Sequence, residues 1–339
     1  MCRCKRVLLL VPVLLLIGCR AQTKQRLPII DMHLHALAAD EQGPPPVGIC
    51  APYEEFPVWD PAQPYEETFM AVLKQPPCTD PIWSPMTDEE LMTQTIEVMT
   101  RRNIVGVLGG TPDRVAAWMK AAPGLFFPGC NFALGPDAPS PDSLRALHAT
   151  GHLAVLAEIL NQYDGITPDD ERMEPYWALA EELDIPVGIH IGPGPMGVIY
   201  LGATGYRARL HSALTLEEVL VRHPRLRVYI MHAGFPMLDD LLAVLYAHPQ
   251  VYVDVGVIVF TQPRAVFYRF IRGIEEAGFG NRVMFGSDQM VWPEAIERGI
   301  AVIEEAPFLS KGQQRDILYN NAARFLRLSP EEIAKHHNR

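Results

Sequence analysis

The sequence is short of basic residues. It contains 29 Lys and Arg against 40 Asp and Glu in 339 residues, a formal net charge of -11 at pH 7. Proteins that coat nucleic acid normally carry a basic excess, so this charge balance argues against a nucleic-acid partner. The same balance argues against a broad electrostatic attachment to anionic lipid.

Cysteine is also scarce, with six residues and no CxxC spacing. That absence argues against a zinc ribbon and against a dithiol redox motif. Cys50 and Cys78 lie in one loop-like stretch, and two alternatives stay open for them: a disulfide or two free thiols. Cys130 follows an apolar run, where we expect a buried thiol.

The apolar run over residues 7–17 is too short to span a bilayer as a helix, which needs about 20 residues. It follows Arg3, Lys5 and Arg6, and this order is typical of a secretory signal. The run ends in Leu16-Ile17-Gly18-Cys19, which resembles the lipobox of bacterial lipoproteins.

The lipobox resemblance implies that residues 1–18 are a removable signal peptide, that Cys19 is lipidated, and that residues 19–26 form a tether. It also implies an exported lipoprotein on the periplasmic side of the membrane, with the outer membrane favoured if present, or at the cell surface. The alternative is an uncleaved N-terminal anchor in which the Cys stands by chance.

Past residue 26 the sequence alternates short apolar runs with amphipathic stretches. Eight apolar runs predict parallel strands over residues 27–32, 104–108, 125–129, 153–157, 185–189, 226–231, 251–255 and 282–285. Helical patterns follow them over residues 86–102, 111–121, 140–147, 173–183, 215–222, 236–247, 264–277 and 293–305. The order predicts an α/β protein, a (β/α)₈ TIM barrel over residues 27–328. A doubly wound open sheet is the alternative, although no GxGxxG follows the first strand.

Residues 36–87 interrupt this rhythm between the first strand and the first helix. The segment holds 11 of the 31 prolines, together with Phe and Trp residues such as Phe56 and Trp59. Connections of this kind normally have 2–6 residues. We therefore expect an ordered insertion that covers the site and selects the substrate. The polar tail over residues 329–339 is expected to fray.

Polar residues stand at the carboxyl ends of five predicted strands, where a barrel carries its chemistry. His33 and His35 are two apart, so their side chains share one face of an extended chain. The other residues at these ends are Glu158, His190, His232 and Asp288. Imidazoles combined with carboxylates suit Zn²⁺, with Mn²⁺, Fe²⁺ or Co²⁺ as alternatives.

These residues resemble the amidohydrolase superfamily, and specifically its amidohydrolase-2 branch. The matching features are His33-Leu34-His35, His190, His232, Asp288 in Phe285-Gly286-Ser287-Asp288, and the closing Asn320-Asn321-Ala322-Ala323-Arg324-Phe325. The resemblance implies a metal-dependent barrel in which His33, His35, His190 and Asp288 hold the main metal ion. His232 would bind a second ion or donate a hydrogen bond to the substrate. Glu158 stands where binuclear members carry a bridging ligand, so one and two ions both stay open.

The leading functional hypothesis is metal-dependent hydrolysis of an amide, lactone or ester bond in a small molecule. Asp288 would accept the proton of the attacking water and His232 would donate to the oxyanion. The first alternative is nonoxidative decarboxylation of an aromatic or related acid. Arg207, Arg209 and His211 are candidates to hold the carboxylate, or else they belong to a solvated loop. The second is a lipoprotein that binds a ligand without turnover. No pattern predicts an oligomeric state.

Overall fold

Eight parallel strands form a closed barrel in the structure, a computed structural model that describes residues 26–339. They pair in two arcs, β1-β4-β5 and β6-β7-β8-β9-β10. Parallel bridges join the arcs on one side at Gly129–Val155 and Phe132–Ile159, and on the other side the Met32 N–H donates to Phe285 O at 2.9 Å. The predicted TIM barrel is therefore confirmed. The strands are β1 (Ile29–His35), β4 (Ile104–Gly109), β5 (Phe126–Pro128), β6 (Leu156–Ile159), β7 (Val187–His190), β8 (Val228–Met231), β9 (Tyr252–Asp254) and β10 (Val283–Met284).

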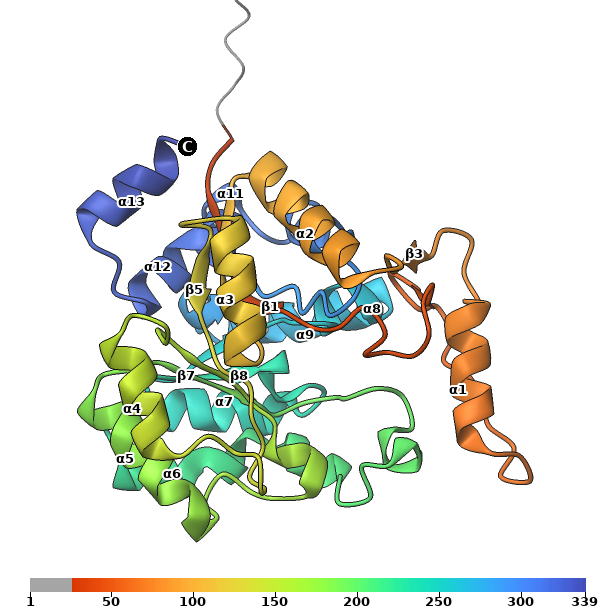
Figure 1. The fold of residues 1–339 in the computed structure, drawn as a ribbon, viewed down its shortest axis with the longest axis horizontal. Helices are drawn as coiled ribbons and strands as arrows, with labels where there is room; N and C mark the ends of the chain where they lie inside the picture. The colour runs from red at the N-terminus through yellow and green to blue at the C-terminus, as the bar shows by residue number, and fades with distance from the viewer. Residues whose placement is uncertain (1–25) are drawn as a thin grey trace, which may run out of the picture.

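A helix follows each barrel strand and packs outside it (Figure 1). The bounds agree with the sequence prediction to within two residues, because the amphipathic pattern and the caps mark both ends. These helices are α2 (Asp88–Arg102), α3 (Pro112–Ala121), α4 (Pro141–Ala149), α5 (Glu174–Glu182), α6 (Glu217–Arg222), α7 (Leu238–Ala247), α9 (Arg264–Glu276) and α10 (Ala295–Glu304).

Helix α2 begins at the capping box that the sequence predicts. The Thr87 hydroxyl accepts from the Glu90 N–H at 3.2 Å, and the Glu90 carboxylate accepts from the Thr87 N–H at 3.2 Å. These two bonds satisfy N–H groups that have no partner inside the helix. The helix ends at Asn103, whose φ of 54° is left-handed.

The first strand runs further than its apolar pattern predicts. We expected it over residues 27–32, but β1 spans Ile29–His35 and all seven of its residues are buried. Its pairing with β4 shifts register between Asp31 and Leu34. His33 and His35 thus belong to the strand itself, because their imidazoles find partners inside the barrel and need no exposure to water.

The insertion over residues 36–87 contains its own secondary structure. Strands β2 (Gly48–Ile49) and β3 (Ile82–Trp83) pair antiparallel, and helix α1 (Tyr65–Lys74) stands between them in the chain, at the right-hand edge of Figure 1. Cys50 and Cys78 form a disulfide, which decides between the two alternatives left by the sequence. The side chains of Val47, Tyr53 and Leu73 are buried.

Three hydrogen bonds hold the insertion against barrel loops. The Trp292 indole N–H donates to Val47 O at 2.9 Å, and the Tyr53 N–H donates to Thr261 O at 2.9 Å. The Tyr65 hydroxyl donates to Met196 O at 2.6 Å. The insertion is therefore attached to the loops that follow β10, β9 and β7, all at the carboxyl ends of the strands.

The C-terminal residues form short helices, and the last of them occupies the tail that was expected to fray. After α11 (Lys311–Arg315) a π-helical turn leads into α12 (Asn321–Phe325), and α13 (Pro330–His337) follows. Ser329 and Glu332 form a capping box at the start of α13. Buried His336 lies 3.1 Å from the Tyr319 hydroxyl through its Nδ1. The expectation of a frayed tail was wrong because this cap and this contact tie the helix to the barrel.

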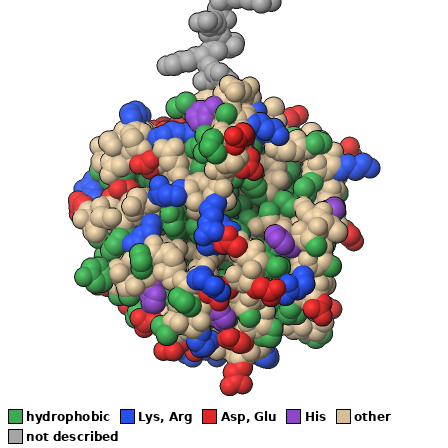
Figure 2. All heavy atoms as spheres, turned by 90° about the vertical axis from the view of Figure 1, so that its left-hand side faces the viewer, with side chains coloured by type: hydrophobic (Ala, Val, Ile, Leu, Met, Phe, Trp, Pro, Cys, Tyr) green, Lys and Arg blue, Asp and Glu red, His purple; other side chains and the backbone are tan. Residues whose placement is uncertain are grey.

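The surface carries ion pairs between exposed side chains, such as Arg145 with Glu182 at 2.7 Å. Figure 2 shows basic and acidic side chains interspersed over one face of the molecule. Exposed pairs of this kind contribute little to stability, about 0–1 kcal/mol each.

Residues 1–25, which include the predicted signal peptide and Cys19, lie outside the described residues. Among residues 26–339 there is no helix with the length and apolar character needed to cross a membrane. The lipoprotein assignment stays a prediction.

Candidate metal centre

The structure brings together all six site residues that the sequence predicts. His33 and His35 come from β1, Glu158 from β6 and His190 from β7, whereas His232 directly follows β8 and Asp288 follows β10. All six side chains are buried at the carboxyl ends of the strands. Barrel closure is the reason, since it places residues from distant parts of the chain at one mouth.

His33, His35 and Asp288 form the first cluster. The Nε2 atoms of the two histidines lie 3.1 Å apart. Asp288 Oδ1 lies 3.0 Å from His35 Nε2 and 3.6 Å from His33 Nε2. The three ligand-type atoms thus converge on one point, as a metal site requires.

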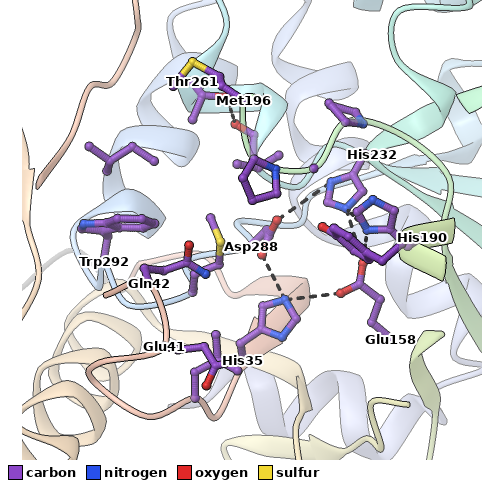
Figure 3. A pocket seen from close by; sticks show the side chains of 18 of the residues that line it. His35, Glu41, Gln42, Glu158, His190, Met196, His232, Thr261, Asp288 and Trp292 are labelled. Atoms are coloured by element: carbon purple, nitrogen blue, oxygen red, sulfur yellow. Dashed lines mark hydrogen bonds and ion pairs between the residues drawn. The ribbon is translucent and has the colours of Figure 1, made fainter. Parts of the chain in front are cut away.

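Glu158 connects this cluster to two further histidines (Figure 3). Its Oε1 lies 2.7 Å from His190 Nδ1 and 3.4 Å from His232 Nε2. Its Oε2 lies 3.7 Å from His33 Nε2. His33, Glu158 and His232 form a second group with ligand spacing. His190 stands outside both groups, and its buried Nε2 has no hydrogen-bond partner.

Asp254 orients His33 and His232. It is not among the predicted site residues. This buried residue ends β9, and its Oδ2 lies 3.0 Å from His33 Nδ1. Its Oδ1 accepts from the backbone N–H groups of His232 at 3.0 Å and Gly256 at 2.9 Å. A carboxylate bonded to Nδ1 holds the proton there and directs the Nε2 lone pair into the site. Glu158 was identified as an acidic residue in an apolar run, and the same pattern applies to Asp254.

The amide side chains of two other residues support His35. Gln289 clamps its backbone, because Oε1 accepts from the His35 N–H at 3.0 Å and Nε2 donates to His35 O at 2.7 Å. Asn131 Nδ2 lies 3.1 Å from His35 Nδ1, and its Oδ1 accepts from the Glu158 N–H. Sequence patterns give no indication of these amides, since both stand in irregular segments.

Left-handed backbone marks the two strand ends that carry His232 and Asp288. Their φ values are 63° and 52°, which are uncommon for residues other than glycine. The Asp288 N–H donates to His33 O at 2.8 Å and keeps this turn against β1. Strained backbone of this kind persists where surrounding contacts enforce it, and it concentrates at functional sites.

The electrostatics of the cluster keep both carboxylates ionised. Burial alone would raise the pKa of Glu158, but the charge and hydrogen bond of His190 outweigh it and hold that pKa well below its ordinary value. Burial likewise opposes ionisation of Asp288, whose pKa is lowered by the charge of His33 and by the neighbouring imidazole of His35. Asp31 differs, because burial raises its pKa to about 7 and its Oδ2 has no partner.

The donor set fits a divalent cation. Asp288 Oδ1 is buried without any hydrogen-bond donor, and the Nε2 atoms of His33 and His35 face it. Crowding several acceptor atoms around one point is unfavourable unless a cation or proton lies between them. Imidazole nitrogen and carboxylate oxygen are the ligands that catalytic zinc and related ions use.

A cavity of about 470 Å³ opens beside this cluster and is largely apolar. Its floor includes His35, Glu158, His190, His232 and Asp288. The walls come from the insertion and from the loops after β5, β6, β7, β9 and β10, and Figure 3 shows Met196 and Trp292 among them. A volume of this size suits a small organic molecule.

The cations expected after the fifth strand do not reach the cavity. Arg207 and Arg209 are exposed, and neither lines it. His211 is buried behind Tyr206, with its Nε2 2.6 Å from the Tyr206 hydroxyl. Burial lowers the pKa of His211 to about 4, so it is uncharged at neutral pH. Arg207 and Arg209 thus lie in a solvated loop, the alternative that the sequence offered for this segment, and none of the three candidates lines the cavity. Pro193, Gly194 and Pro195 do line the cavity.

The closed barrel, with its cluster of imidazoles and carboxylates, defines a metal-dependent TIM-barrel enzyme. The model of the family described as Amidohydrolase matches residues 30–328, and the chain belongs to this family.

Solved structures show the same fold. One is an uncharacterized TIM-barrel protein from Bordetella bronchiseptica, with 18% identity, a TM-score of 0.59, and coverage of 92% of this chain and 100% of that chain. Another is a probable 2-pyrone-4,6-dicarboxylic acid hydrolase from Acinetobacter baumannii with citric acid bound, with 14% identity, a TM-score of 0.57, and coverage of 89% and 100%. A third is 5-carboxyvanillate decarboxylase from Sphingomonas paucimobilis, with 14% identity, a TM-score of 0.54, and coverage of 90% and 100%. No curated protein matches the sequence.

Proposed function

We propose that the protein is a metal-dependent hydrolase that cleaves an amide, lactone or ester bond of a small molecule. The observation that carries this proposal is Asp288. Its carboxylate is buried, lines the cavity, and has one oxygen without a hydrogen-bond donor beside His33 and His35. A carboxylate that faces the substrate space and is not neutralised by Lys or Arg is suited to accept a proton.

The residues that would hold the metal are His33, His35, His190 and Asp288, with Glu158 and His232 available to a second ion. When bound, a divalent ion, most simply Zn²⁺ and otherwise Mn²⁺, Fe²⁺ or Co²⁺, polarises the scissile carbonyl and lowers the pKa of water. The backbone favours a ligand role for neutral His232, because its Nδ1 lies 3.0 Å from Gly256 O and this bond leaves the Nε2 lone pair in the site.

Asp288 accepts the proton of the attacking water while the water oxygen bonds to the carbonyl carbon. It returns that proton to the oxygen or nitrogen that leaves when the scissile bond breaks. If a single ion is bound, His232 would not be a ligand and would instead donate in its protonated form to the developing oxyanion. The insertion would exclude water and position the substrate, which agrees with the bonds that attach it to three barrel loops.

Decarboxylation of an aromatic acid is the alternative, and the similar solved structures include decarboxylases of 5-carboxyvanillate and 2,6-dihydroxybenzoate. That reaction calls for a cationic side chain to hold the substrate carboxylate. No Lys or Arg stands among the described residues that line the cavity. This lining favours hydrolysis.

Metal removal tests the proposal. Treating the purified protein with a chelator should lower hydrolysis across a panel of esters, lactones and amides by more than about 100-fold, and Zn²⁺ should restore it. Hydrolysis that continues unchanged after metal analysis shows an empty site would contradict the proposal. Release of CO₂ from an arylcarboxylate would identify the decarboxylase instead, and tight binding without turnover would identify a binding protein.

We also propose that Cys19 anchors the protein to a membrane as a lipoprotein. The Cys50–Cys78 disulfide supports export, because disulfides persist in oxidising compartments. Replacing Cys19 by Ala should abolish labelling with a fatty-acid analogue and move the protein from the membrane fraction to the soluble fraction. Equal labelling of both forms would exclude lipidation at this residue.

A further inference from the structure

Apolar side chains form most of the cavity walls next to the charged cluster. The insertion contributes Ile49, Tyr53, Phe56, Phe69 and Leu73. The barrel loops add Leu160, Tyr163, Met196, Val257, Met290 and Trp292. A substrate body that fills this space exchanges water for apolar contacts over most of its surface.

Apart from the phenols of Tyr53 and Tyr163, the ionisable groups along the cavity are carboxylates and imidazoles. Outside the metal cluster the lining contains one charged residue, Glu41, which is exposed at the insertion. Within the described residues, neither Lys nor Arg contributes to the lining. A negative substituent on the substrate body would therefore meet repulsion at Glu41 and no cationic side chain along the cavity walls.

Cations near the insertion are directed elsewhere. Lys74 donates to the carbonyl oxygens of Pro44 and Pro46. Arg114 donates to Leu37 O at 3.2 Å and pairs with Asp88 at 2.9 Å. These side chains bind the backbone of the insertion and do not line the cavity, so a substrate inside it does not contact their charged groups.

With one divalent cation bound, the metal cluster offers no surplus positive charge either. Glu158 and Asp288 contribute two carboxylates, which balance one divalent cation, and Asp254 adds a third negative charge beside His33. Moving a carboxylate from water into such a site is strongly unfavourable unless a positive partner compensates.

We infer that the substrate is an uncharged molecule in which the scissile ester, lactone or amide is attached to an apolar body. This inference rests on the proposed hydrolysis and adds the substrate class to it. The cavity discriminates against the same molecule when its body ends in a carboxylate, and the discrimination comes from the missing cation and from Glu41. Specificity of this kind arises from repulsion and unpaired charge as much as from attraction.

A matched pair of esters tests the inference by turnover. The neutral ester is para-nitrophenyl hexanoate, and mono-para-nitrophenyl adipate replaces its terminal methyl group with a carboxylate. We expect kcat/KM to favour the hexanoate by roughly 100-fold or more, in excess of the ratio for spontaneous hydrolysis of the two esters. A ratio that favours the adipate would overturn the inference and leave the hydrolase standing.

Substitutions at the insertion show where the discrimination arises. Gln42 lines the cavity, so Gln42→Arg should lower the hexanoate-to-adipate ratio by about tenfold by supplying the missing cation. Gln75→Arg is the matched control, because Gln75 is exposed outside the cavity lining and the variant carries the same added charge. Equal ratios in the two variants would contradict a local electrostatic origin.

Equilibrium binding separates this inference from the proposed function. Titrating the chelated and the Zn²⁺-loaded protein with naphthylmethanol and with naphthoate, by calorimetry, requires no turnover. Tighter binding of the alcohol to both forms supports the inference. Absence of ester hydrolysis would then count only against the proposed hydrolase activity. Tighter binding of naphthoate to the chelated form, or no binding of the alcohol, would overturn it.

Discussion

Replacing Asp288 by Asn is expected to lower kcat for ester or lactone hydrolysis by about 10²–10⁴-fold at saturating Zn²⁺. The carboxylate holds one oxygen 3.0 Å from His35 Nε2 and exposes another face to the cavity. An amide keeps the size and an oxygen ligand, but it cannot accept a proton near neutral pH. Steady-state kinetics, with metal content measured on the same sample, would report the effect.

Asp31→Asn is the matched control for this change. Asp31 is equally buried, yet its Oδ1 accepts from the backbone N–H groups of His33 and Ser287 and does not touch an imidazole. The asparagine oxygen preserves both bonds, so kcat should stay within a few-fold of the original. A loss of kcat in Asp31→Asn as large as that in Asp288→Asn would show that buried charge, and not proton transfer, matters.

Asp254→Asn is expected to weaken metal binding by about 10–100-fold while the protein stays folded. The asparagine oxygen can still accept from the His232 and Gly256 N–H groups. Its NH₂ group would then face His33 Nδ1, where Asp254 Oδ2 now lies at 3.0 Å. Two donors cannot share this contact, so His33 would move its proton to Nε2 and lose the lone pair that faces the site.

Competition with a metal-sensitive dye would measure the affinity, and a thermal melt would establish folding. Asp31→Asn again serves as the control, since it does not alter the tautomer of any histidine. Unchanged affinity in Asp254→Asn would mean that His33 does not bind the ion through Nε2. If Asp254→Asn unfolds, Asp254→Glu becomes the test variant. It retains the acceptor for His33 Nδ1 and should keep more metal affinity than Asp254→Asn.

The fold was largely predictable because local patterns and burial agree. Continuous apolar runs such as residues 226–231 have no polar face, so they must be covered on both sides, as parallel strands are. Helix starts such as that at Thr87 carry their caps in the sequence. The tail was misjudged because α13 depends on a contact between His336 and Tyr319, which are far enough apart that no local pattern reveals it.

The site was predictable where it consists of ligand-type residues at strand ends. The residues that hold these ligands in place were not predictable, because they lie far from the ligands in sequence and meet them only in the folded protein. Gln289 holds His35 across 254 positions of sequence, and Asn131 reaches it across 96. Arg207 and Arg209 stand after the fifth strand, as candidates for a substrate carboxylate should, but the loop carries them to the surface. The direction in which a side chain points after a strand depends on the conformation of the loop. Loops have no periodic sequence pattern, so this direction could not be predicted.

The sequence by itself determined the barrel, the identity of the six clustered side chains, and the proline-rich insertion, because each depends on composition and spacing along the chain. Tertiary structure alone decided which nitrogen of each histidine faces the site, whether Cys50 and Cys78 pair, and whether any cation lines the cavity. These properties depend on contacts between residues distant in sequence, which form only when the barrel closes and the insertion packs over its mouth.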